Sequence, residues 1–88
     1  MLYIVIILIN YDNMITISKL QSFLASRGVH ADEFERNKNV IKFEVKDSKE
    51  VFNMYRLNYK HMEYEGYDIY FMHETKKIFS CTLNKLKN

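Results

Sequence analysis

The sequence predicts one small α+β domain, and three observations in its 88 residues support this. Residues 2–9 form an apolar, largely β-branched run, two later stretches repeat apolar residues at helical spacing, and others alternate apolar and polar residues. A chain of this length is sufficient for one domain only. Hydrophobic residues make up 48% of the chain, which is enough for a core and speaks against disorder. We place the core in residues 2–73 and a C-terminal extension in residues 74–88.

Residues 2–9 form the first predicted strand. Both of its faces are apolar, so we expect a central strand that is covered on each side. The run is much shorter than the roughly 20 residues of a membrane helix, and it lacks the basic start and cleavage site of a signal peptide. We therefore expect no membrane association. The sequence leaves open whether Met1 or Met14 is the natural start.

Residues 16–27 form the first predicted helix. Ser18 and Gln21 have the spacing of a capping box, and Gly28 follows the last turn, where a left-handed residue is favoured. The apolar residues that share one face are Ile17, Leu20, Phe23 and Leu24.

The second predicted helix begins at Asp47, which with Glu50 makes another capping signature. We expect it to run to about Asn58, or as far as His61. Its buried side is predicted to consist of Val51, Phe52 and Tyr55, with Met54 as a further candidate.

The remaining stretches predict strands. Residues 30–36 and 40–46 form a hairpin around a turn at 37–39, and residues 67–72 form a strand before a turn at 73–76. Residues 77–83 predict a last strand, with a helix as the alternative. The order β-α-β-β-α-β indicates a ferredoxin-like sandwich, in which two helices cover one face of an antiparallel sheet and residues 2–9 lie in its middle.

Four stretches of this pattern also match a known family. They are LYIVIIL, ITISKLQSFLASRGV, NVIKFEVKDSKEVFNMYRLN and MEYEGYDIYFM, within residues 2–73. Together they resemble an RNA-recognition-motif (RRM-like) domain. The resemblance implies that the open face of the sheet stacks single-stranded bases on aromatic residues. Tyr3 matches the aromatic position of the first strand, whereas Val40 and Lys42 stand at the two aromatic positions of the third strand.

The predicted open face combines apolar and charged residues. We expect one of three things to cover it: a protein partner or a second copy of the chain, the segment 77–86, or a nucleic acid. Its residues are Tyr3, Val5, Ile7, Val40, Lys42, Glu44, Asp68, Tyr70 and Met72.

The charge of the chain is only mildly basic. The net charge is +2, with a pI of about 8.6, which does not by itself indicate a nucleic-acid protein. Lysines do gather near the end of the chain, and this basic tail consists of Lys76, Lys77, Lys85 and Lys87. A nucleic-acid-binding role would use Tyr3, Lys42 and Tyr70 together with this tail.

We predict no catalytic residue, no metal site and no cofactor. His30, His61, His73 and Cys81 do not have the spacing of metal ligands. Cys81 is the only cysteine, so we expect a buried side chain and a cytoplasmic location. One alternative is Asp12, because a Tyr-Asp pair after a first strand resembles the Cas2-type nucleases, in which that carboxylate holds a metal.

These observations favour a non-enzymatic binding protein. The partner is expected to be a protein or a second copy of the chain, forming a dimer, and docking would use the sheet face or the acidic and aromatic strip from Tyr55 to Tyr70. The composition, with no proline and two glycines, is typical of AT-rich genomes, including those of phages. Hence we expect an accessory protein of a phage, virus or mobile element that inhibits host machinery, such as an anti-CRISPR or other anti-defence inhibitor.

Overall fold

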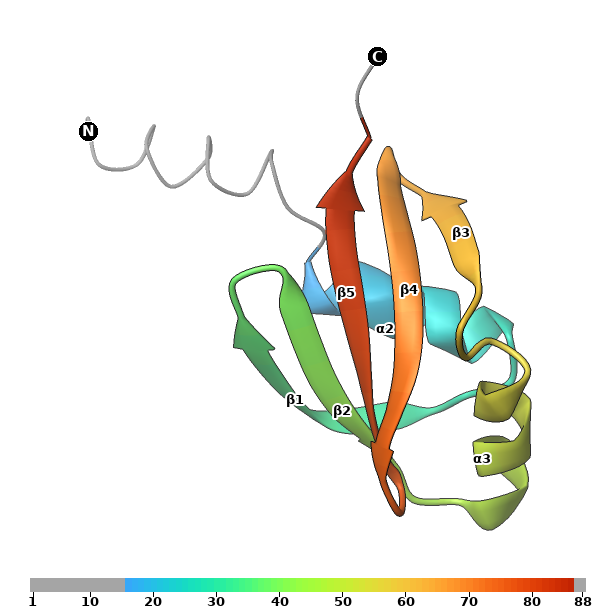
Figure 1. Cartoon of the computed structure of the whole chain (residues 1–88). Helices are drawn as coiled ribbons and strands as arrows, with labels where there is room; N and C mark the ends of the chain where they lie inside the picture. Colours follow the sequence, from blue (N-terminus) through green and yellow to red (C-terminus); the bar gives the residue numbers. More distant parts are fainter. Residues whose placement is uncertain (1–15, 87–88) are drawn as a thin grey trace.

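The computed structural model describes residues 16–86, which form two helices and one five-stranded sheet (Figure 1). The elements are α2 (Ile17–Ser26), β1 (Ala31–Asn37), β2 (Val40–Val45), α3 (Ser48–Tyr55), β3 (His61–Tyr64), β4 (Tyr67–Thr75) and β5 (Ile78–Lys85). The predicted α+β class is confirmed. The first predicted strand, at residues 2–9, lies outside the described residues.

The strands follow the order β1-β2-β5-β4-β3, and all neighbours are antiparallel. Strand β5 thus lies between β2 and β4, the central position that the prediction gave to residues 2–9. The last strand predicted at residues 77–83 is confirmed as β5, and the alternative helix is not formed. Strand β5 contributes Phe79, Cys81 and Leu83 to the core. The order of the described strands is therefore not clearly ferredoxin-like and does not confirm the predicted four-stranded arrangement.

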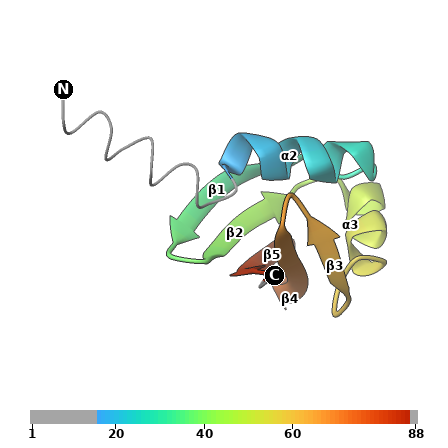
Figure 2. The ribbon, with the colours of Figure 1, turned by 90° about the horizontal axis from the view of Figure 1, so that it is seen from above.

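Helix α2 covers one face of the sheet (Figure 2). The rings of Phe23 on α2 and Phe71 on β4 lie 6.2 Å apart, centroid to centroid, so the helix and the sheet meet directly. Each fully buried apolar side chain of this kind contributes about 1.5–3 kcal/mol to folding. The sheet residues buried beneath the helices are Ile41, Phe43, Val45, Ile69, Phe71, Phe79, Cys81 and Leu83.

Polar contacts define the ends of α2. The N-cap is Thr16, whose hydroxyl accepts a hydrogen bond from the Lys19 amide, and not the predicted Ser18. At the other end Gly28 has a φ of +79°, and the Val29 amide donates to the Leu24 carbonyl, as in a Schellman motif. The left-handed glycine predicted at this position is therefore confirmed.

Helix α3 begins at the predicted N-cap but ends early. The Asp47 carboxylate accepts hydrogen bonds from the amides of Lys49 and Glu50. The helix then stops at Tyr55, because the Tyr59 amide donates to the carbonyl of Phe71 and so pairs the chain with β4. Strand β3, at residues 61–64, was not predicted. Of its four residues only His61 is named in the sequence prediction, as the furthest end of the second helix.

A second contact ties α3 to the segment before β1. The Glu50 carboxylate accepts hydrogen bonds from the backbone amide and from the ring nitrogen of His30. Both hydrogen bonds lower the pKa of Glu50 from its ordinary value. The bond from the His30 backbone amide has the larger effect, and the bond from the His30 ring has the smaller one. This contact therefore stabilises the fold only while Glu50 is ionised.

The pH dependence of stability tests this contact. Since the folded pKa of Glu50 is below the unfolded value of about 4.3, the stabilisation is complete above that value and is lost as pH falls through the folded pKa. We expect Glu50→Gln to lower the free energy of unfolding in urea at pH 7, and the difference from wild type to shrink between about pH 5 and pH 3. Glu63→Gln, at an exposed site on β3, is the control. A difference that stays constant over this range would contradict the assignment.

Candidate binding surface

The structure places six of the predicted open-face residues on one face of the sheet, opposite α2. Their partners in register are residues of β5: Val40 and Tyr70 both pair with Thr82, and Lys42 and Met72 both pair with Ser80. The six are Val40, Lys42 and Glu44 on β2 and Asp68, Tyr70 and Met72 on β4. Strand β5 therefore separates the two predicted groups. Tyr3, Val5 and Ile7 lie outside the described residues.

Polar contacts run across this face. The Ser80 hydroxyl donates to the Glu74 carboxylate at 2.7 Å, and a ring nitrogen of His61 lies 2.8 Å from an Asp68 carboxylate oxygen. Met72 is the one large hydrophobic residue of β2, β4 and β5 that is classed as exposed. Within residues 16–86, the exposed apolar area is concentrated elsewhere.

Three large aromatic side chains are exposed on α3 and the segment after it. The exposed fraction is 68% for Phe52, 45% for Tyr55 and 60% for Tyr59. The prediction that Phe52 and Tyr55 are buried is wrong. Instead α3 buries Val51 and Met54, because the chain beyond the helix is held against β4, and this fixes which side of the helix meets the core.

Ring contacts join these side chains to their neighbours in two pairs. The centroids of Phe52 and Tyr55 are 6.1 Å apart, those of Tyr59 and Tyr70 are 6.4 Å apart, and the His61 ring lies 4.7 Å from Tyr70. We call Phe52, Tyr55, Tyr59 and Tyr70 the aromatic edge. It lies around α3 and the segment between α3 and β3, which runs beside β4 just ahead of the start of β3 (Figure 1).

Tyr59 has a strained backbone. Its φ is +63°, in the left-handed region, which is uncommon for a bulky residue. A conformation of this kind costs about 1–3 kcal/mol and persists only when neighbouring contacts hold it. The hydrogen bond from the Tyr59 amide to the Phe71 carbonyl, 2.8 Å long, provides such a contact. The strained residue thus carries one of the most exposed rings in the described part of the chain.

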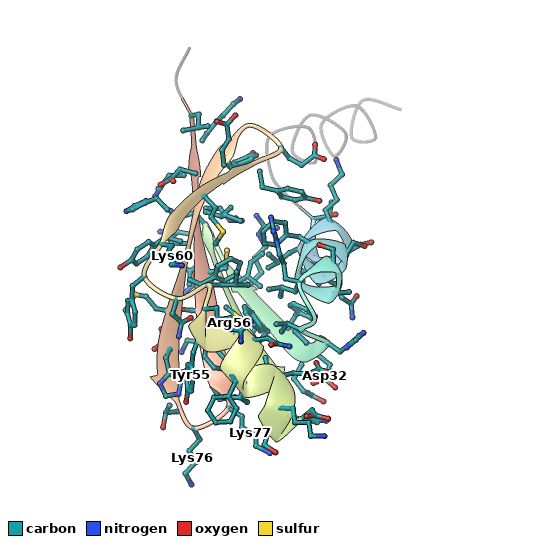
Figure 3. The ribbon with its side chains drawn as sticks, turned by 90° about the vertical axis from the view of Figure 1, so that its right-hand side faces the viewer. Asp32, Tyr55, Arg56, Lys60, Lys76 and Lys77 are labelled. Carbon is teal, nitrogen blue, oxygen red and sulfur yellow. The ribbon has the colours of Figure 1, made fainter. Side chains whose placement is uncertain are left out.

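Cations accompany the aromatic edge. Among residues 16–86, no carboxylate lies within ion-pair distance of Arg56, Lys60 or Lys76. Figure 3 shows Lys60, Arg56 and Tyr55 following one another down the side formed by α3, with Lys76 below them at the β4–β5 turn. We call Arg56, Lys60 and Lys76 the basic column.

The predicted basic tail does not form one patch. Lys76 and Lys77 precede β5, whereas Lys85 is its last residue, so about 25 Å of strand separates them. The Lys77 ammonium also donates to the Lys46 carbonyl, at 2.6 Å. Lys87 lies outside the described residues. Of the four predicted lysines, only Lys76 belongs to the basic column.

The remaining candidate residues are spread through the fold. Burial raises the pKa of Cys81 to about 12, so its thiol is protonated and unreactive at neutral pH. Within the described range 16–86, no cluster of three or more histidine, cysteine or carboxylate side chains is placed to hold a metal. In the same range, no helix is long and apolar enough to cross a membrane. Asp12, the nuclease candidate, lies outside it.

Comparison with family models, curated proteins and solved structures gives no match for this chain. The resemblance to RNA-recognition motifs and the role as a phage or anti-defence inhibitor therefore stay predictions.

The orientation of α3 can be tested by a pair of substitutions. We expect Met54→Ala to lower the free energy of unfolding by about 2–5 kcal/mol, because it leaves a cavity in the core. Phe52→Ser should change it by no more than about 0.5 kcal/mol, because the ring is largely in solvent. Both are measured by urea unfolding monitored by circular dichroism. Equal losses, or a larger loss for Phe52→Ser, would contradict the orientation.

Proposed function

We propose that this chain is a non-enzymatic binding protein that docks a macromolecule through its aromatic edge. The observation that carries the proposal is the exposure of Phe52, Tyr55 and Tyr59 within one short segment. Isolated exposed apolar residues are normal, but contiguous ones mark interaction sites.

The residue types on this surface are those that contribute most to binding. Phe, Tyr and Arg are enriched at interfaces, and Tyr and Arg are among the commonest hot-spot residues. Burying a ring that is 60–68% exposed, such as Tyr59 or Phe52, removes more apolar area from water than burying any side chain of the mixed sheet face. The strain at Tyr59 supports the same conclusion, since strained residues concentrate at functional sites.

The proposal moves the binding site away from the centre of the predicted sheet face. Of the residues predicted there, Tyr70 is part of the aromatic edge, because its ring contacts Tyr59. The ferredoxin-like and RRM-like arrangement of residues 2–73, with binding at the middle of the sheet, stays a prediction from the sequence. A protein partner or a second copy of the chain also stays a prediction, and either could occupy the aromatic edge.

Site-specific photocrosslinking tests the proposal. We place p-benzoylphenylalanine at Phe52 and, as a matched control, at Ser22 on the exposed side of α2, and irradiate each protein in a cell extract that retains its nucleic acids. Adducts are expected from position 52 and not from position 22.

The specificity of those adducts is tested with Tyr59→Asn. Asparagine adopts the left-handed conformation more readily than tyrosine, so the variant should fold with equal or greater stability. It lacks the exposed ring, and adducts from position 52 should fall. Equal adducts from positions 52 and 22, or adducts that Tyr59→Asn leaves unchanged, would overturn the proposal.

A further inference from the structure

We infer that the partner of the aromatic edge is a single-stranded nucleic acid, whose bases stack on the exposed rings and whose phosphates contact the basic column. This inference rests on the proposed function, because it names the partner of the same surface.

The cations next to the aromatic edge are available for contacts. The carboxylates of α3 and β4 accept hydrogen bonds, Glu50 from His30 and Glu74 from Ser80, and Asp68 lies beside His61, while Glu63 on β3 is exposed. The cations of the basic column have no ion-pair partner among residues 16–86. The three cations are therefore free to contact the phosphate oxygens of a polyanion.

Two rings of the aromatic edge can offer a face to a ligand. The planes of Phe52 and Tyr55 meet at 83°, and those of Tyr59 and Tyr70 meet at 65°. Phe52 and Tyr59, which are the most exposed of the four rings, therefore do not stack on these neighbours and can offer a face to a planar ligand. Tyr55 also contacts the rings of His73 and Phe79, and Tyr70 lies at 35° to the His61 ring. Nucleic-acid bases are planar ligands, and each base stacked on an aromatic side chain contributes to affinity whatever its sequence.

Rings and cations also alternate along the chain. Arg56 directly follows Tyr55, and Lys60 directly follows Tyr59, so each tyrosine has a phosphate-binding group beside it. Protein–protein interfaces favour aromatic residues and arginine but are depleted in lysine. A single strand uses both residue types, whereas a duplex keeps its bases stacked and unavailable to these rings. The alternation therefore favours a single strand over an acidic protein or a duplex.

Fluorescence anisotropy tests the inference. The probes are labelled 12-nucleotide RNA and DNA of mixed sequence and a duplex of the same sequence, titrated with the full chain between 50 and 200 mM salt. We expect the single strands to bind more tightly than the duplex. With one phosphate contact from each of three cations, log K should fall with log salt at a slope of about −2.

Two variants of equal charge separate the sites. Arg56→Gln with Lys60→Gln should weaken binding and reduce the slope by about 1.4. Lys38→Gln with Lys42→Gln removes the same charge from the β1–β2 turn and the predicted sheet face, and should leave binding unchanged. Phe52→Ser and Tyr59→Asn should each weaken binding by about fivefold to a hundredfold, with circular dichroism confirming the fold.

Several outcomes would overturn the inference. Tighter binding of the duplex than of the single strands would exclude stacking of bases on the rings. Equal losses of affinity in the two double variants would mean that the nucleic acid binds elsewhere or without a defined site. Absence of nucleic-acid binding, while adducts from position 52 still depend on Tyr59, would point to a protein partner and leave the proposed function standing. Absence of both would remove the proposed function as well.

Discussion

The hydrogen bond from the Tyr59 amide to the Phe71 carbonyl is the contact on which the candidate surface depends. It pairs the chain after α3 with β4, just ahead of the start of β3, and so fills the edge of the sheet. The helix must stop at Tyr55 for this pairing to form, and Asn58 is buried as a result. The same pairing sets the rotation of α3, with Val51 and Met54 inward and Phe52 and Tyr55 outward.

The surface that results is costly for a free protein. The exposed Phe52 side chain contributes little to the free energy of folding, because it is not buried. The left-handed backbone of Tyr59 lowers the stability by about 1–3 kcal/mol. The core under α2 offsets these costs, because the central strand β5 is paired on both sides and buries three apolar side chains. A rigid sheet therefore supports a strained, aromatic edge, which is the arrangement expected of a binding site on a stable scaffold.

Local signals in the sequence were sufficient for the class and for several element ends. The Asp47 cap, the left-handed Gly28 and the alternation of Ile41, Phe43 and Val45 depend on neighbouring residues, and all three are confirmed. The order of the strands depends on pairing between distant segments, which periodicity does not encode. The rotation of α3 was missed because Val51 and Phe52 are both apolar, although the spacing from Val51 to Met54 was available as a signal.

The pairing of Tyr59 with β4 can be observed directly by nuclear magnetic resonance. The measurement is the scalar coupling across the hydrogen bond between the Tyr59 amide nitrogen and a carbonyl carbon, in uniformly labelled protein. We expect this coupling to the Phe71 carbonyl carbon. A coupling to the Tyr55 carbonyl carbon instead would mean that α3 continues through residue 59, and it would contradict the rotation of the helix and the aromatic edge built on it.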